Sequence, residues 1–136
     1  MSDYRGDRAG AARVLIVEDE VLMAMSLAME LQNAGYEVAD RLPSGEEAVQ
    51  FMRANPADVV IMDIRLTGEM DGVEAAVQIR EFSEAPIVFM TGYSDREHDP
   101  ALAQARPAGF LIKPVSFSRL RDLLDRVTDT DSGQQV

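Results

Sequence analysis

The sequence predicts a single α/β domain built on a parallel β-sheet. Short apolar runs alternate with helical patterns along the 136 residues, which is typical of βαβ units with right-handed crossovers and helices on both faces of the sheet. Polar residues that carry chemistry follow the ends of several of these runs. The chain is long enough, and its hydrophobic content of 46% is high enough, to form a hydrophobic core.

The first half of the chain supplies three strands and two helices. Gly35 is placed to close the first helix, since glycine favours the residue just past a helix end. Ser44 and Glu47 have the spacing of a capping box and predict the start of the second helix. The strands are expected at 13–17, 36–39 and 59–63, and the helices at 21–34 and 45–54.

The second half continues the alternation, with one irregular helix. Asp99 followed by Pro100 predicts an N-cap and a first helical turn, but Pro107 prevents a long helix, so this fourth helix is expected to be short or irregular, at roughly 100–105. The remaining helices are expected at 72–82 and 116–127, and the strands at 87–90 and 109–112. Residues 1–12 and 128–136 are predicted to be mobile tails flanking a domain at 13–127.

Composition excludes several classes of function. The formal net charge of −11 disfavours nucleic-acid binding, which depends on Lys and Arg at phosphates. No apolar run approaches the ~20 residues of a membrane span, and the polar N-terminal segment does not resemble a signal peptide. The absence of cysteine removes disulfides and thiolate metal sites. We therefore predict a cytoplasmic protein that binds neither membranes nor nucleic acid.

The polar residues at the strand ends are expected to meet at one edge of the sheet. Glu18 and Asp19 follow the first strand, Asp63 ends the third, Thr91 follows the fourth and Lys113 follows the fifth. In an open parallel sheet, ligands bind beyond the carboxyl ends of the strands. The sequence therefore predicts a cluster of three carboxylates with a hydroxyl and an ammonium group.

Crowded carboxylates of this kind suit a divalent cation. Two like charges ~4 Å apart at an effective dielectric constant of ~20 repel by ~4 kcal/mol, so protonation, Lys113 or a cation must offset the repulsion. Carboxylates, a backbone carbonyl and water suit Mg²⁺, with Mn²⁺ as an alternative ion. When the cation neutralises charge, one carboxylate can act as a nucleophile and form an acyl phosphate.

These residues carry a family resemblance. The chain resembles a response-regulator receiver domain of two-component signalling over about 13–127. The resemblance implies a single-domain receiver with a flavodoxin-like doubly wound sheet of strand order 2-1-3-4-5. The matching motifs are Val17-Glu18-Asp19-Glu20, Met62-Asp63, Met70-Asp71-Gly72, Met90-Thr91-Gly92 and Lys113-Pro114.

The resemblance also implies a role for each site residue. Asp63 would be the phosphoacceptor, taking a phosphoryl group from a phosphohistidine donor in a two-component or phosphorelay pathway. The other implied roles are Mg²⁺ binding by Glu18, Asp19, Asp63 and the backbone carbonyl of Arg65, phosphoryl contact by Thr91 and Lys113, an aromatic switch at Phe110, and a cis peptide before Pro114. Arg65 and Tyr93 flank the site, where they would shield it or tune the access of water.

The sequence departs from the common family pattern in three places. The first of the paired acids is Glu18 rather than Asp, and the switch aromatic is Phe110 rather than Tyr. The loop at 65–72 is one residue longer than usual and lacks its proline. The run Phe89–Tyr93 also resembles the Phe-Ala-Thr-Gly signature of stand-alone receivers in alphaproteobacterial stress signalling.

The first helix offers two interpretations. It is apolar beyond one face, because Leu22, Met25 and Met29 form a second stripe beside the first one. The helix is either deeply packed or presents a patch on which a histidine kinase or histidine phosphotransfer protein docks, since methionine suits adaptable surfaces. Output would then be by protein–protein contact or onward phosphotransfer. The only histidine, His98, lies in a polar loop, so the chain is expected to accept phosphate rather than act as a kinase.

Two other functions remain as alternatives. A Mg²⁺-dependent phosphohydrolase of the haloacid dehalogenase type also forms an aspartyl phosphate, but it requires a second Asp two residues after the nucleophile, where this chain has Arg65. A pseudo-receiver would serve only as a binding module. The intact set of acids, Thr91 and Lys113 argues against it. The main interpretation is that the chain is not an enzyme toward other substrates, because it catalyses only its own phosphorylation and dephosphorylation.

Overall fold

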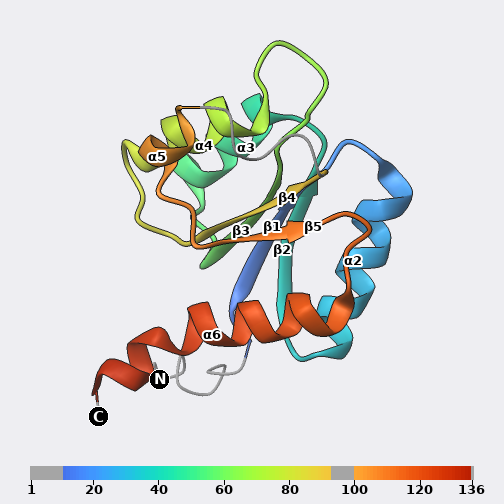
Figure 1. The fold of residues 1–136 in the computed structure, drawn as a ribbon, viewed down its shortest axis with the longest axis vertical. Coiled ribbons are helices and arrows are strands. Elements are labelled where there is room, and N and C mark those ends of the chain that lie inside the picture. Colours follow the sequence, from blue (N-terminus) through green and yellow to red (C-terminus); the bar gives the residue numbers. More distant parts are fainter. Residues whose placement is uncertain (1–10, 93–99, 136) are drawn as a thin grey trace.

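The computed structural model describes residues 11–92 and 100–135 and has a five-stranded parallel sheet between two layers of helices (Figure 1). The strand order is β2-β1-β3-β4-β5, which confirms the predicted flavodoxin-like fold. In chain order the elements are β1 (Arg13–Val17), α2 (Val21–Asn33), β2 (Glu37–Leu42), α3 (Gly45–Ala54), β3 (Val59–Asp63), α4 (Gly72–Arg80), β4 (Ile87–Thr91), α5 (Leu102–Ala105), β5 (Gly109–Ile112) and α6 (Phe117–Gln135). Tyr93 and His98, which was predicted to lie in a polar loop, are outside the described residues.

Each face of the sheet packs on its own helices (Figure 1). Successive side chains along β1 point to opposite faces, as the pleat requires. Leu15 and Val17 pack toward α3, α4 and α5, whereas Val14 and Ile16 pack toward α2 and α6. The central strands β1, β3 and β4 are therefore buried on both faces, which explains why they appear in the sequence as unbroken apolar runs.

Ser44 caps the start of α3 as predicted, but the capping box that it was expected to form with Glu47 is incomplete. The Ser44 hydroxyl accepts from the Glu47 backbone N–H (3.2 Å), but the Glu47 carboxylate accepts from the Ser44 hydroxyl (3.0 Å) rather than from its backbone. The expected capping box at α3 is thus only half formed. A complete one begins α4, where Asp71 accepts from the Glu74 N–H (2.9 Å) and Glu74 accepts from the Asp71 N–H (3.0 Å).

Several element boundaries differ from the sequence prediction. The second strand continues to Leu42 instead of ending at Ala39, because its backbone pairs with β1 beyond a register irregularity although its side chains there are polar. Helix α4 ends at Arg80, two residues early. Helix α6 runs to Gln135 rather than to Val127, since no proline interrupts it and the Thr128 hydroxyl can donate to the Leu124 carbonyl (2.8 Å). The mobility of 128–136 stays a prediction.

Helix α5 is short, as Pro100 and Pro107 predicted. It ends at Arg106 in the left-handed conformation (φ 51°). The Arg80 guanidinium supports this end from α4 by donating to the carbonyls of Ala105 (2.7 Å) and Ala85 (2.6 Å). Within 11–92 and 100–135, no helix combines the length and hydropathy needed to cross a bilayer.

Gly72 allows the site loop to return close to β3, and its substitution gives a first prediction. A Cβ at this position would lie 2.0 Å from the Asp63 carbonyl oxygen, which is backbone and cannot move aside. We expect Gly72→Ala to reduce the free energy of unfolding by ~3 kcal/mol, measured by urea denaturation. Gly35→Ala is the control: its site is open, and only the strained φ of 97° costs free energy, ~1 kcal/mol. Equal losses in the two variants would contradict the packing argument.

Candidate functional site

The sheet register brings the predicted site residues together at the carboxyl edge of β1, β3, β4 and β5. Hydrogen bonds between strands continue one residue past the strand ends: the Ile64 N–H donates to the Met90 carbonyl (3.0 Å) and the Lys113 N–H donates to the Thr91 carbonyl (2.9 Å). The residues that follow each strand are therefore held in register. The three acids and Lys113 meet there because the backbone fixes their starting points.

Lys113 forms ion pairs with two of the three acids. Its Nζ lies 2.8 Å from Asp63 Oδ2 and 3.2 Å from Glu18 Oε1. Burial alone would lower the pKa of Lys113, but the hydrogen bond and charge of Asp63, together with the charge of Glu18, raise it above its usual value. The lysine is therefore firmly cationic and offsets part of the repulsion between the two buried carboxylates.

Burial disfavours the ionisation of Glu18. Glu18 is only 2% exposed. Burial and the charge of Asp63 raise its pKa to about 7, although the Glu20 N–H and Lys113 act to lower it. Its Oε1 is buried without a hydrogen-bond partner, although Lys113 lies near it. A buried carboxylate oxygen with no hydrogen bond is an atom that a cation would satisfy.

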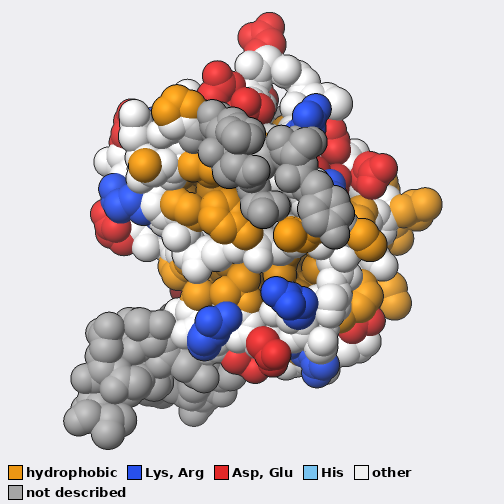
Figure 2. Space-filling view, viewed as in Figure 1, with side chains coloured by type: hydrophobic (Ala, Val, Ile, Leu, Met, Phe, Trp, Pro, Cys, Tyr) orange, Lys and Arg blue, Asp and Glu red, His pale blue; other side chains and the backbone are white. Residues whose placement is uncertain are grey.

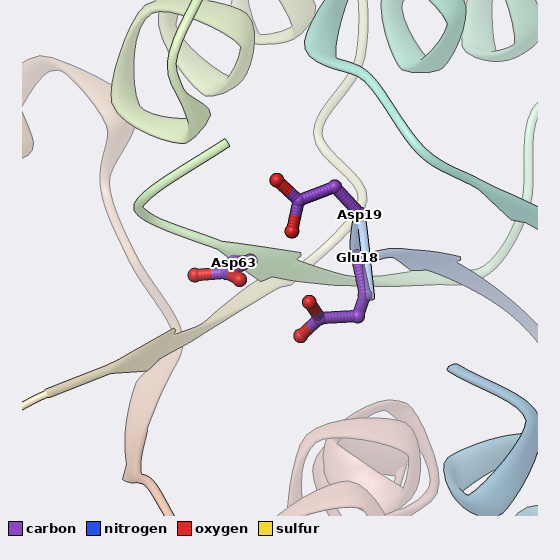
Figure 3. A group of neighbouring side chains, drawn as sticks. All are labelled: Glu18, Asp19 and Asp63. Atoms are coloured by element: carbon purple, nitrogen blue, oxygen red, sulfur yellow. The ribbon is translucent and has the colours of Figure 1, made fainter. Parts of the chain in front are cut away.

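The carboxylates of Glu18, Asp19 and Asp63 converge on one space (Figure 3). One oxygen from each lies within 4.8 Å of the others. Asp19 differs from Glu18 because hydrogen bonds from the backbone N–H and hydroxyl of Thr67 outweigh burial and lower its pKa. Three hard oxygen donors in this arrangement fit Mg²⁺, which prefers octahedral oxygen coordination completed by water.

The structure places the remaining predicted residues as follows. The Arg65 N–H donates to Asp63 Oδ1 (3.0 Å), so its backbone lies beside the acids while its side chain is exposed. Thr91 is buried, and its hydroxyl donates to the Gly92 carbonyl (2.9 Å). Phe110 is 38% exposed and stacks on buried Phe89 with ring centroids 5.9 Å apart. The Lys113–Pro114 peptide is cis, as expected.

Sequence reasoning missed Thr67. Its backbone N–H donates to Asp19 Oδ2 (3.1 Å), which links the loop after β3 to the loop after β1. A signal was present, since the loop at 65–72 lacks the proline that the family pattern carries, and any other residue brings an N–H to that loop. The acceptor of that N–H could not be read from the sequence.

The family profile described as "Response regulator receiver domain" matches residues 14–125. This chain belongs to the response-regulator receiver family. The matched range contains all five strands except the first residue of β1, and the match leaves the haloacid dehalogenase alternative unsupported.

Curated relatives include both longer and similar-sized proteins. The chain is 41% identical over 117 residues to the transcriptional regulatory protein PdtaR of Mycobacterium tuberculosis, covering 84% of this chain and 55% of PdtaR. It is 33% identical over 117 residues to the chemotaxis protein CheY of Thermotoga maritima, covering 85% of this chain and 97% of CheY. The chain thus spans about half the length of PdtaR.

Solved receiver structures share the fold. The signal receiver domain of a modulated diguanylate cyclase from Desulfovibrio desulfuricans is 33% identical, with a TM-score of 0.82 over 91% of this chain and 98% of that one. The receiver domain of the sensor histidine kinase PA1611 from Pseudomonas aeruginosa has magnesium coordinated in its active-site cleft; it is 26% identical, with a TM-score of 0.77 over 87% and 98% of the two chains.

The raised pKa of Glu18 gives a second prediction, for the metal-free protein. The folded state binds a proton that the unfolded state releases between the ordinary value of 4.5 and about 7, so stability falls as pH rises through this window. Gln mimics the protonated acid. Glu18→Gln should therefore stabilise the fold by ~3 kcal/mol at pH 8 and by little at pH 4.

Urea denaturation in the presence of EDTA measures this effect. Glu20→Gln is the control, because it removes one exposed carboxylate from the same loop. A Glu18→Gln variant that is no more stable than the wild type at pH 8 would show that Lys113 already neutralises Glu18.

Proposed function

We propose that the chain is a Mg²⁺-dependent phosphoacceptor whose Asp63 takes a phosphoryl group from a phosphohistidine protein. One observation carries the proposal: three carboxylates and Lys113 meet at the carboxyl edge of the sheet, where the Lys113 Nζ lies 2.8 Å from Asp63 Oδ2 and 3.2 Å from Glu18 Oε1. A structural ion-pair network would not need a third carboxylate beside the two that Lys113 already pairs.

The transfer step uses this arrangement. A carboxylate oxygen of Asp63 attacks phosphorus, the N–P bond of the phosphohistidine breaks, and the imidazole nitrogen keeps the electron pair. Mg²⁺ held by Glu18, Asp19, Asp63 and the Arg65 carbonyl would offset charge on the transferring oxygens. Lys113, 2.8 Å from Asp63, supplies a second positive charge there, and the hydroxyl of Thr91 can turn from Gly92 to a phosphoryl oxygen.

The donor is proposed to dock on α2. Contrary to the deeply packed alternative, Val21, Leu22, Met25 and Met29 are exposed, at 67%, 80%, 43% and 61%. Apolar side chains project over α2 at the right-hand edge of Figure 2. The stripe starts directly after the acidic loop, so a helix packed on it would bring a phosphohistidine close to Asp63. A histidine kinase or histidine phosphotransfer protein fits this surface.

Phosphorylation of Asp63 is also proposed to change the surface that the protein presents to its downstream partner. Phosphorylation would draw Thr91 toward the phosphoryl group and allow Phe110 to turn inward along Phe89, altering a surface read by another protein or used in onward phosphotransfer. Arg65 and Tyr93 would modulate the phosphoryl lifetime, and the chain would catalyse only its own phosphorylation and dephosphorylation.

A cytoplasmic location agrees with the absence of cysteine, and the Phe-Ala-Thr-Gly subtype stays a prediction.

A phosphorylation assay tests the central assignment. The wild type incubated with Mg²⁺ and acetyl phosphate should gain one phosphoryl group on Asp63, mapped by mass spectrometry after borohydride reduction. Addition of EDTA should abolish labelling, and Asp63→Asn should lower it at least 100-fold because the amide is not a nucleophile. Mg²⁺-dependent labelling of Asp63→Asn at another residue would move the acceptor elsewhere.

A docking prediction concerns α2. The binding partner for this test is the histidine phosphotransfer protein of the source organism that phosphorylates the wild type fastest. Calorimetry should show that this partner binds the double variant Leu22→Ala/Met25→Ala about tenfold more weakly than it binds the wild type. Phe82→Ala is the control, since Phe82 is a partly exposed apolar residue (37%) that follows α4, a helix on the other face of the sheet from α2. Equal loss from both substitutions would remove α2 as the docking surface, whereas phosphorylation by acetyl phosphate should be unchanged in both.

A further inference from the structure

Each of the three clustered carboxylates has one oxygen held by a backbone N–H. Glu18 Oε2 accepts from the Glu20 N–H (3.0 Å), and Asp63 Oδ1 accepts from the Arg65 N–H (3.0 Å). Both of these bonds span two residues and form within a single loop. The third bond, from the Thr67 N–H to Asp19 Oδ2 (3.1 Å), joins residues 48 apart in the sequence. Asp19 alone among the three is oriented by a different loop.

Asp19 also needs that support more than its neighbours do. Glu18 and Asp63 are 2% and 3% exposed and are both paired with Lys113, so packing and charge already fix them. Asp19 is only half-buried, and no ion pair with Lys113 joins it. An aspartate with one side in solvent loses rotamer freedom when it binds a cation, and that loss weakens the binding.

The loop that carries Thr67 is built to present it. Leu66 is buried in the core on one side of Thr67, and Gly68 on the other side has a φ of 103°, a turn conformation that glycine adopts without strain. Thr67 itself is exposed. This loop lacks the proline of the common receiver pattern, and proline would have no N–H to donate.

We propose that Thr67 is a positioning residue of the cation site, because its backbone N–H holds one oxygen of Asp19 and leaves the other facing Glu18 and Asp63. The inference rests on the Mg²⁺ site of the proposed function. Figure 3 shows the Asp19 carboxylate with one oxygen turned toward the other two acids and one turned away. The bond also ties the loop of Asp19 to the loop whose Arg65 carbonyl completes the donor set, so the two loops present their oxygens together.

Magnesium affinity measured by calorimetry on the unphosphorylated protein tests the proposal without relying on phosphotransfer. Thr67→Ser keeps the backbone N–H and should bind Mg²⁺ within twofold of the wild type. Thr67→Pro loses the N–H and should bind about tenfold more weakly, as is typical when a group that orients a metal ligand is removed. Equal or tighter binding by Thr67→Pro would overturn the proposal.

Amide hydrogen exchange decides the question even where Thr67→Pro does not fold. In the wild type the Thr67 amide should be protected, and saturation with Mg²⁺ should preserve or increase that protection, because the cation binds the other oxygen of Asp19. Loss of protection on adding Mg²⁺ would mean that the cation displaces Thr67 and would overturn the proposal. Asp19→Ala should expose the Thr67 amide to exchange, and Glu20→Ala should not.

The failure of this inference can be distinguished from failure of the proposed function. A wild type that binds no Mg²⁺ at millimolar concentration overturns both. A wild type that binds Mg²⁺ and is phosphorylated on Asp63, together with Thr67 variants of unchanged affinity, overturns only the positioning role.

Discussion

Repulsion among three carboxylates at one edge of the sheet is the constraint on which the site depends. At ~4 Å and an effective dielectric constant of ~20, each of the three pairs contributes ~4 kcal/mol of repulsion. Lys113 is the one lysine of the chain, and its Nζ contacts only two of these acids. The remainder is relieved by partial protonation of Glu18 and by backbone N–H donors to all three acids. Protonation lowers the charge, whereas the N–H donors stabilise it, and neither removes a carboxylate, so the site is left able to bind a cation.

The fold places these charges with little freedom. The three acids lie at the ends of β1 and β3, and Lys113 follows the end of β5. Backbone hydrogen bonds between the strands continue past these ends. Gly72 then brings the loop after β3 back against Asp63, and the capping box of Asp71 and Glu74 starts α4 at once. The loop that would contribute the Arg65 carbonyl is thus closed at both ends by rigid elements. A cation site built this way requires little rearrangement on binding.

The elements that could be predicted from the sequence are those with a strong local signal. β3 and β5 have their predicted boundaries because a buried parallel strand reads as an apolar run, and the short α5 follows from two prolines. The extension of β2 could not be read, because Asp40 and Arg41 are polar and only backbone pairing to β1 makes them strand. Thr67 was missed for a similar reason: its partner is 48 residues away, and only the register of the sheet brings them together.

Glu18 stands where the family pattern usually has Asp, and this difference changes which carboxylates share the ammonium group of Lys113. The longer side chain brings Oε1 to 3.2 Å from Lys113, so the lysine is shared between Glu18 and Asp63. When Asp63 carries a phosphoryl group, the new charge competes for Lys113 and leaves Glu18 to be balanced by protonation or by Mg²⁺. Burial already raises the pKa of Glu18 to about 7 in the metal-free site, so protonation of Glu18 would compete with the cation as the pH falls. Cation occupancy and the protonation of Glu18 would therefore be coupled, and release of the proton from Glu18 would favour the cation that the proposed transfer to Asp63 requires.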